Sequence, residues 1–220
     1  MNVTHQIINY DSRHRVKVLY PTAQSRSFVK AFLQQLYCLT SDLSQAIIDI
    51  DNTSRTVPGN SSASLRVIHP GLDAGDDSRA VNPNSGANIV GYHFNIYADD
   101  CGIQVGTSAT AVAVADDNLV APIAHGTGAG QFVYYGCYGL NYTTGASSAS
   151  FDVERIFRNG SGGSIVVAEI GMYTRATTET SNVNENEVFG FCILRDVLGA
   201  TVTVLNGEYL KVKYTITVSN

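Results

Sequence analysis

The segment 209–218 near the end of the chain shows a strict alternation of apolar and polar side chains. One set is apolar or aromatic and the other consists of lysines and threonines: Leu210, Val212, Tyr214, Ile216 and Val218 alternate with Lys211, Lys213, Thr215 and Thr217. Successive side chains of a β-strand point to opposite faces, so this pattern predicts a strand with one buried face and one solvent-exposed face. Such strands are typical of antiparallel sheets, which limits the fold to a few β architectures.

Strand patterns recur through the region from residue 89 to the C-terminus. Besides 209–218, the predicted strands are 89–98, 104–115, 131–140, 150–158, 164–173, 188–194 and 201–205. Asn206-Gly207 is typical of a tight hairpin turn, and the glycine-rich residues 159–163 of a longer hairpin loop. Because no helical pattern separates these strands, we predict a mainly β protein with an antiparallel, jelly-roll-like β-sandwich over residues 89–220.

Residues 1–88 lack this regular succession of strand patterns. They are predicted to form an N-terminal arm with one amphipathic helix at about 25–39. Ser25 or Ser27 can cap this helix, because a hydroxyl there accepts hydrogen bonds from the first-turn amides. An apolar stripe follows at three- and four-residue steps, and it ends at Leu39. A face this broad must be buried against the sandwich or a neighbouring copy, so the predicted assembly interface is Phe28, Val29, Phe32, Leu33, Leu36 and Tyr37.

The rest of the arm contains short strand patterns separated by long polar segments. The strand candidates are 16–20, 47–51 and 65–68, and the residues from 52 to 88 are otherwise rich in Ser, Gly, Asn, Asp and Pro. Loops this long are unusual inside a compact domain. We therefore expect them on a surface or in contact with a neighbouring subunit.

Composition restricts the partners of the chain. Only 15% of the residues are charged, against an average of about 25% in soluble proteins, and uncharged polar residues fill the gap. Such a surface favours contact with other protein, and we expect a homo-oligomer. The formal charge of −5 and the scattered basic residues argue against nucleic acid as a partner.

No apolar run approaches the roughly 20 residues that a membrane-spanning helix needs, so no membrane association is expected. The first residues lack the basic and apolar regions of a secretory signal, which favours synthesis and folding in a cytoplasm. The four cysteines have no metal-ligand or CxxC spacing and are predicted to be buried, reduced thiols: Cys38, Cys101, Cys137 and Cys192.

No motif in the sequence predicts an enzyme, a metal site or a cofactor. The glycine-rich residues 125–130 match neither GxGxxG nor a P-loop and precede a strand pattern, so a flexible connection is favoured. The acidic pairs at 76–77, 99–100 and 116–117 lack EF-hand spacing, although a calcium site built from distant loops stays open. Neither GxSxG nor HExxH occurs, and the five histidines are isolated.

Five charged residues interrupt apolar strand patterns: Glu154, Arg155, Glu169, Arg195 and Asp196. A charge inside a strand is costly unless it is paired. We expect structural ion pairs, with Arg155 or Arg195 opposite Glu169. Such pairs can either set the register between strands or form a contact between subunits.

Several of these segments resemble structural proteins of tailed bacteriophages. The residues 151–173 are similar to a segment that recurs in that family, as are 194–198 followed by 201–204 and the closing strand; 102–107, 123–126 and the helix at 27–37 fit the same pattern. The resemblance implies a β-sandwich virion protein of the head-decoration or tail-accessory type. It brings no catalytic residues with it.

The expected function is therefore that of a non-catalytic virion component, made in the host cytoplasm, that self-assembles and docks onto capsid or tail proteins. Its place in the head, neck, tail or fibre stays open. An alternative is a receptor- or glycan-binding sandwich that recognises a host surface glycan, with Tyr134, Tyr135, Tyr138 and Tyr142 as candidates. A second alternative, a hydrolase of cell wall or capsule, would need a carboxylate pair such as one involving Glu154 or Glu169.

Overall fold

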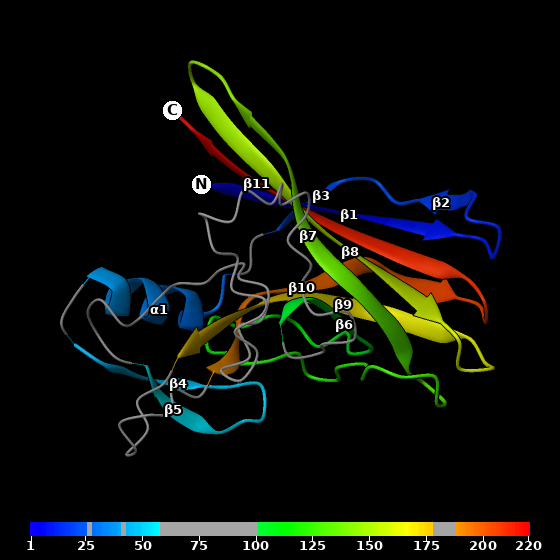
Figure 1. The fold of residues 1–220 in the computed structure, drawn as a ribbon, viewed down its shortest axis with the longest axis horizontal. Helices are drawn as coiled ribbons and strands as arrows, with labels where there is room; N and C mark the ends of the chain where they lie inside the picture. The colour runs from blue at the N-terminus through cyan, green and yellow to red at the C-terminus, as the bar shows by residue number, and fades with distance from the viewer. Residues whose placement is uncertain (26–27, 41–42, 58–100, 178–187) are drawn as a thin grey trace, which may run out of the picture.

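In the computed structural model, two antiparallel sheets pack face to face, and one helix lies against the outer side of the smaller sheet (Figure 1). The structure describes residues 1–25, 28–40, 43–57, 101–177 and 188–220. The predicted class, an antiparallel β-sandwich with one helix, is confirmed. The described helical residues include no segment long and apolar enough to cross a membrane.

The larger sheet has six strands and contains both ends of the chain. Its order is β2 (Val16–Leu19), β1 (Asn2–Tyr10), β11 (Tyr209–Ser219), β8 (Ser148–Asn159) and β7 (Phe132–Thr144), with β3 (Ala23–Ser25) also paired to β1. The alternation predicted for β11 is present, since Leu210, Val212 and Tyr214 are fully buried in the core. The lysines and threonines of β11 lie on the outer face of this sheet.

The smaller sheet has the order β10 (Val188–Val204), β9 (Ile165–Thr177) and β6 (Gly102–Gly106). Over most of their length these strands are covered on both faces, which explains why their sequences are apolar runs rather than alternating patterns. One face packs against the large sheet in the main core, through residues such as Ile103, Ile170 and Val202. The other face, with Tyr173 and Phe191, packs against the helix layer.

The helix layer consists of α1 (Lys30–Thr40) and the two-stranded ribbon of β4 (Gln45–Ile48) and β5 (Ser54–Val57). The helix begins at Lys30 rather than near residue 25, because Ser25 is already part of β3. Ser27 and the strand candidates 65–68 and 89–98 lie outside the described residues.

The predicted apolar stripe of α1 divides in the structure. Val29 is buried, and Phe28 and Phe32 pack partly against the main core. Leu33, Leu36 and Tyr37 are instead 63%, 41% and 44% exposed. The face turned to the small sheet carries Ala31, Gln35 and Cys38. Gln35 is a polar residue that accepts a hydrogen bond from the Thr174 hydroxyl at 2.9 Å, so the buried face was not the most apolar one.

The described strands β1, β2 and β3 of the predicted N-terminal arm belong to the large sheet of the sandwich. β1, which the sequence pattern did not predict, pairs with β11 along its whole length, from Asn2 opposite Thr217 to Tyr10 opposite Tyr209. Its inward side chains are Val3, His5, Ile7 and Asn9, all buried. Two polar residues among four interrupt the alternation that would have marked a strand.

Both turn signals of the C-terminal half connect the two sheets instead of forming hairpins. β8 and β9 belong to different sheets, and so do β10 and β11. Hydrogen bonds join the two corners: the Asn159 side-chain amide donates to the carbonyls of Gly163 and Val204, and Gly162 N donates to Asn206 Oδ1.

The predicted strands 188–194 and 201–205 are one strand, β10, whose register shifts between Val197 and Val202. The predicted strand 104–115 is shorter and ends with β6 at Gly106.

Candidate functional site

A groove of about 460 Å³ lies on the outer face of the large sheet, away from the core. Its lining includes four tyrosines from three strands, one carboxylate, two permanent cations, a histidine and an isoleucine: Tyr10, Tyr135, Tyr138, Tyr209, Glu154, Arg155, Lys211, His14 and Ile156. This volume falls within the range of roughly 300–1,000 Å³ that is usual for ligand sites. The groove is therefore the candidate functional site.

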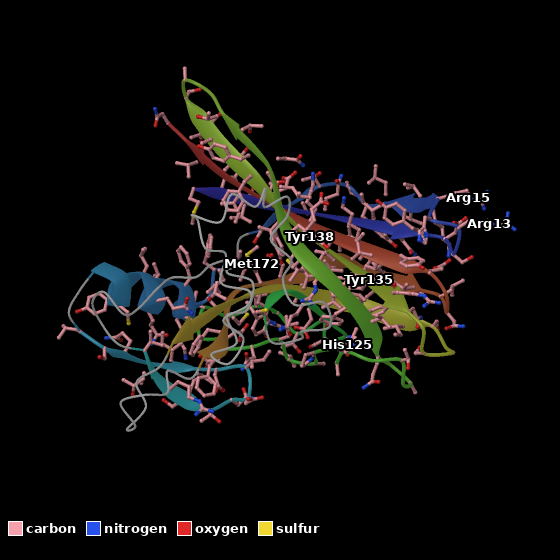
Figure 2. All side chains as sticks on the ribbon, in the orientation of Figure 1. Arg13, Arg15, His125, Tyr135, Tyr138 and Met172 are labelled. Atoms are coloured by element: carbon pink, nitrogen blue, oxygen red, sulfur yellow. The ribbon has the colours of Figure 1, made fainter. Side chains whose placement is uncertain are left out.

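A bulge in β7 positions two of these tyrosines. The pairing of β7 with β8 shifts between Tyr134 and Cys137, which face Phe157 and Arg155 respectively. β7 thus has one residue more than β8 over this stretch, which reverses the alternation of its side chains. Tyr134 and Cys137 point into the core, while Tyr135 and Tyr138 both line the groove. Figure 2 shows Tyr135 and Tyr138 along this strand.

Gly136 at the bulge leaves room for the ring of Tyr138. A Cβ atom at Gly136 would lie 2.8 Å from the Tyr138 hydroxyl oxygen and 3.0 Å from the adjacent ring carbon. These distances are shorter than a normal van der Waals contact. A side chain at position 136 would therefore displace the Tyr138 ring from this wall of the groove.

The opposite wall is formed by β11, β1 and the turn between β1 and β2. Tyr209 lies directly opposite Tyr10, and its ring centroid is 4.3 Å from that of His14 and 6.5 Å from that of Tyr135. The His14 backbone is left-handed, with φ of 62°. These side chains form an aromatic row across the sheet.

The Asp11 carboxylate fixes the turn that holds His14. It accepts hydrogen bonds from the backbone amides of Arg13 and Arg15 and pairs with the Arg15 guanidinium at 2.7 Å. The bond from the Arg15 amide, followed by that from its side chain, lowers the pKa of Asp11 to about 2. The turn, whose Arg13 and Arg15 are visible at one end of the sheet in Figure 2, is thus fixed at neutral pH.

Glu154 and Lys211 form the polar floor of the groove. Their side chains, from neighbouring strands, pair at 2.5 Å and are about one-sixth to one-fifth exposed, at 15% and 21%. The partly buried pair places a hydrogen-bond acceptor and a donor among aromatic rings. Among the described residues that line the groove, Glu154 is the one carboxylate.

Arg155 supports the bulge from the core side. Its guanidinium donates to the carbonyls of Tyr135, Cys101 and Ile103 at 2.8, 2.8 and 3.0 Å. It also lies 4.7 Å from the centre of the Tyr134 ring. Arg155 therefore satisfies a carbonyl that the irregular strand leaves without a ladder partner.

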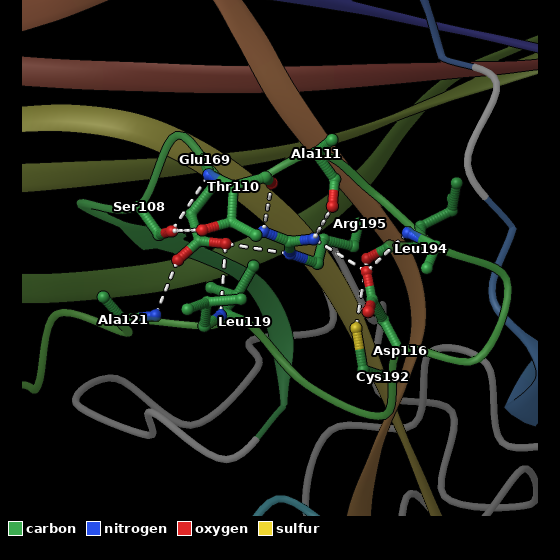
Figure 3. A network of polar contacts seen from close by, with 12 residues as sticks. Ser108, Thr110, Ala111, Asp116, Leu119, Ala121, Glu169, Cys192, Leu194 and Arg195 are labelled. Atoms are coloured by element: carbon green, nitrogen blue, oxygen red, sulfur yellow. Dashed lines mark hydrogen bonds and ion pairs between the residues drawn. The ribbon is translucent and has the colours of Figure 1, made fainter.

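Glu169 and Arg195, two of the five charged residues singled out from the sequence, meet in a buried network (Figure 3). Arg195 Nε donates to Glu169 Oε2 at 2.9 Å, and both side chains are completely buried. Arg195 Nη1 also binds Asp116 at 2.7 Å, and Nη2 donates to the Thr110 carbonyl. Burial works against the charged guanidinium, but the bonds to the two carboxylates outweigh it and raise the pKa of Arg195.

The same network attaches the loop between β6 and β7 to the small sheet. The two oxygens of Glu169 accept hydrogen bonds from the backbone amides of Ala121 and Val120. Gly106 makes this approach possible, since a Cβ there would lie 2.5 Å from Glu169 Oε1. The network thus holds a long loop within one chain, and Glu169 has no open side toward a ligand.

Asp196 lies at a second polar cluster inside the sandwich. Its carboxylate accepts a hydrogen bond from the Tyr214 hydroxyl at 3.1 Å and lies 3.8 Å from His5 Nδ1. Desolvation lowers the pKa of His5, although the charge of Asp196 opposes that effect. Burial, reinforced by Asp196, raises the pKa of Tyr214.

The residues expected for a hydrolase or a glycan site are separated in the structure. Glu154 lines the groove, whereas Glu169 is in the buried network, so the two carboxylates share no cleft. Tyr134 is fully buried and Tyr142 is 72% exposed near the end of β7. Tyr10, His14 and Tyr209 were not predicted, because the fold brings them together from opposite ends of the chain. The described residues contain no group of three or more His, Cys, Asp or Glu that could hold a metal ion.

Comparison with family models, with curated proteins and with solved structures found no match to this chain.

Proposed function

We propose that the protein is a non-catalytic structural component of a tailed-phage virion, which self-assembles and docks onto capsid or tail proteins. The observation that carries the proposal is the projecting end of the large sheet, where β7 and β8 extend beyond the smaller sheet (Figure 1). The virion setting is proposed from the resemblance of segments such as 151–173 to tailed-phage structural proteins.

The projecting end exposes side chains on both faces of the sheet. The last six residues of β7, from Gly139 to Thr144, are all exposed. Leu140 and Tyr142 of β7 are 42% and 72% exposed, and Val218 at the end of β11 is 56% exposed. Within the described part of the chain no second layer covers this extension, and exposed apolar side chains there favour contact with another protein.

The edge strand of this extension lacks the usual protection against pairing. Among the strands that the structure describes, β7 is the last in the sheet order, and no charged residue occurs between Gln131 and Asp152. Exposed edges are normally protected by charged residues or proline, because their backbone groups can pair with another chain. The same edge of a second copy is the partner that we propose for it.

The exposed side of α1 is a second contact surface in the proposal. Leu33, Leu36 and Tyr37, three of the residues expected at the interface, are exposed on it. Val29, Phe28 and Phe32 pack within the chain and have a structural role in the proposal.

The test is the native mass of the purified protein by light scattering. We expect a discrete oligomer for the full chain and a shift to monomer when Leu140→Lys and Tyr142→Lys place charges on the edge of β7. Val114→Lys is the matched control, because Val114 is also 72% exposed but lies in the loop after β6. A monomeric wild-type chain, or an oligomer that the edge variant leaves intact, would contradict assembly through this edge; the variant Leu33→Lys then tests the helix surface.

A further inference from the structure

We infer that the groove lined by Tyr10, Tyr135, Tyr138 and Tyr209 is a saccharide-binding site, taking an uncharged pyranose between the aromatic rings and the Glu154–Lys211 pair. This inference goes beyond assembly and does not depend on it. The groove and the projecting edge are different parts of the large sheet: the groove lies around Tyr10, Tyr209 and the bulge, and the exposed edge begins at Gly139.

The aromatic residues of the groove are not needed for the core of the sandwich. The main core is made by the inward side chains of the same strands, such as Leu210 and Val212 of β11 and Phe157 of β8. Tyr135 is instead 36% exposed, and Tyr10 and Tyr209 are partly exposed. A cluster of aromatic rings on the wet face of a sheet is typical of a binding surface, because each ring combines a large apolar face with a polar hydroxyl.

The rings of the groove are partly exposed and are tilted against one another. Tyr209 is tilted by 58° against His14 and by 39° against Tyr135, so the three rings do not stack flat on one another. A pyranose has C–H groups on its faces and hydroxyls around its rim. Its faces can therefore pack on the rings while its hydroxyls point to the polar floor.

The floor has the hydrogen-bonding groups that sugar hydroxyls require. A hydroxyl both donates and accepts, the Glu154 carboxylate accepts, and the Lys211 ammonium donates. The 2.5 Å pair between them fixes both groups before any ligand arrives. Arg155 also lines the groove, but it is 1% exposed and donates to backbone carbonyls of the core side. Since the charges of the more exposed pair, Glu154 and Lys211, compensate each other, the floor favours an uncharged ligand over a phosphate or a carboxylate.

A proline-rich peptide is the competing ligand for an aromatic groove. Proline has no backbone N–H, so such a peptide offers acceptors but few donors, and the Glu154 carboxylate would lose solvent without gaining a partner. A saccharide supplies donors and acceptors at once. The composition of the floor therefore favours the saccharide.

Contacts within the chain hold the groove in shape, which reduces the cost of binding. Arg155 supports the β7 bulge from below, Gly136 makes room for Tyr138, and Asp11 fixes the turn that carries His14. Each of these contacts is made within the chain. We therefore expect binding without a large rearrangement.

The experiment screens the full-length protein on an array of neutral oligosaccharides and measures the affinity of the best hit by titration calorimetry. Tyr135→Ala and Glu154→Gln are expected to weaken binding by about tenfold or more, a factor that corresponds to the loss of one good contact. Val166→Ala is the control, because Val166 is exposed to a similar degree, 42%, on a strand of the other sheet. Tyr135→Phe keeps the ring and should retain most of the affinity.

The native mass and thermal unfolding of each variant are measured alongside, so that loss of folding or of assembly is recognised separately from loss of binding. Binding that falls in Tyr135→Ala and Glu154→Gln while the control and the native mass are unchanged supports the inference, whether or not the wild-type chain is an oligomer. No saccharide binding, binding unaffected by both groove variants, or binding of a proline decamer in its place would overturn it.

Discussion

Arg195 is a fully buried cation whose charge is balanced by two carboxylates, Glu169 and Asp116. Removing one partner of a buried pair leaves the other desolvated and without compensation, which costs more than the pair contributes as a whole. The chain also has an exposed arginine pair, Arg15 with Asp11, whose arginine side chain is 70% exposed. The two arginines allow the same substitution to be compared at a buried and an exposed position.

We expect Arg195→Met to lower the free energy of unfolding by about 3–5 kcal/mol, because it leaves the Glu169 carboxylate buried without its cation. Arg15→Met should change it by less than about 1 kcal/mol, as is usual for exposed pairs. Urea unfolding monitored by circular dichroism measures both. Similar losses for the two variants would show that Glu169 is satisfied by the backbone amides of Val120 and Ala121 alone.

His5 gives a pH dependence that can be separated from that of the carboxylates. Desolvation lowers the pKa of this buried histidine below its ordinary value of 6.5, although Asp196 opposes the shift. Below pH 6.5, His5 is protonated more readily in the unfolded chain than in the folded chain. The free energy of unfolding therefore has its full value above pH 6.5 and decreases as the pH falls below 6.5. The pKa values of Asp152 and Glu208 are lowered from 3.8 and 4.5. These carboxylates therefore stabilise the fold above those pH values, and their contribution is lost only in more acidic solution than that of His5.

We expect His5→Asn to reduce the loss of stability between pH 7.5 and pH 5.5, because the variant has no imidazole at the buried position 5. The midpoint of urea unfolding at the two pH values measures the effect, and each chain is compared with itself at pH 7.5. His14→Asn is the control, since His14 is exposed in the β1–β2 turn. If both variants keep the wild-type slope, another group is responsible for the acid sensitivity.

At the scale of elements, β1 is the strand whose importance the sequence pattern conceals. It lies between β2 and β11, so removing it would expose the backbone edge of β11. Ile7 and Ile8 are neighbours on this strand with the same side chain, and the pleat turns Ile7 into the core at 3% exposure and Ile8 to the outer face. This pair tests the register directly.

Ile7→Ala is expected to cost about 2–5 kcal/mol of unfolding free energy, the range for truncating a buried isoleucine. Ile8→Ala should cost clearly less, because its side chain is only partly buried. Chemical denaturation of both variants gives the comparison. Equal costs, or a larger cost at Ile8, would contradict the pairing of Asn2–Tyr10 with β11.

The sequence allowed prediction of those elements whose exposed and buried faces differ in polarity. β11 has lysines and threonines outside and apolar residues inside, and it was predicted within one residue of its observed end. β1 was not predicted, because His5 and Asn9 are polar and buried. The face of α1 was assigned only in part, since its buried side contains Gln35 and Ala31 while Leu33 is exposed.

The groove escaped prediction for a different physical reason. A period of two places Tyr134 and Tyr138 on one face of β7, and the bulge after Tyr134 puts them on opposite faces. A regular alternating pattern cannot reveal an extra residue in one strand, and the contacts that accompany this bulge, such as the bond from Arg155 to the Tyr135 carbonyl, join segments distant in the sequence. Tyr10 and Tyr209 meet through the pairing of the first and last strands, which depends on the topology of the whole chain.

At the scale of the whole molecule, the labelling of the four cysteines can show whether the packed layers unfold together. All four are free and buried, as the sequence predicted. Cys101 and Cys137 belong to the main core, and Cys38 and Cys192 to the cluster between the small sheet and the helix layer. Burial raises the pKa of Cys137 to about 11 and that of Cys192 to about 12, so these thiols are protonated in the folded protein at pH 8.

We expect a thiol-specific reagent at pH 8 to label none of the four cysteines in the folded protein, because attack requires both access and a thiolate. In increasing urea, labelling should begin at the global unfolding transition and involve both clusters at once, since Tyr173 and Phe191 of the small sheet connect the helix layer to the sandwich. Mass spectrometry of tryptic peptides assigns the label to each position. Labelling of Cys38 below the transition, with Cys101 and Cys137 still protected, would show that the layer of α1, β4 and β5 opens as a unit of its own.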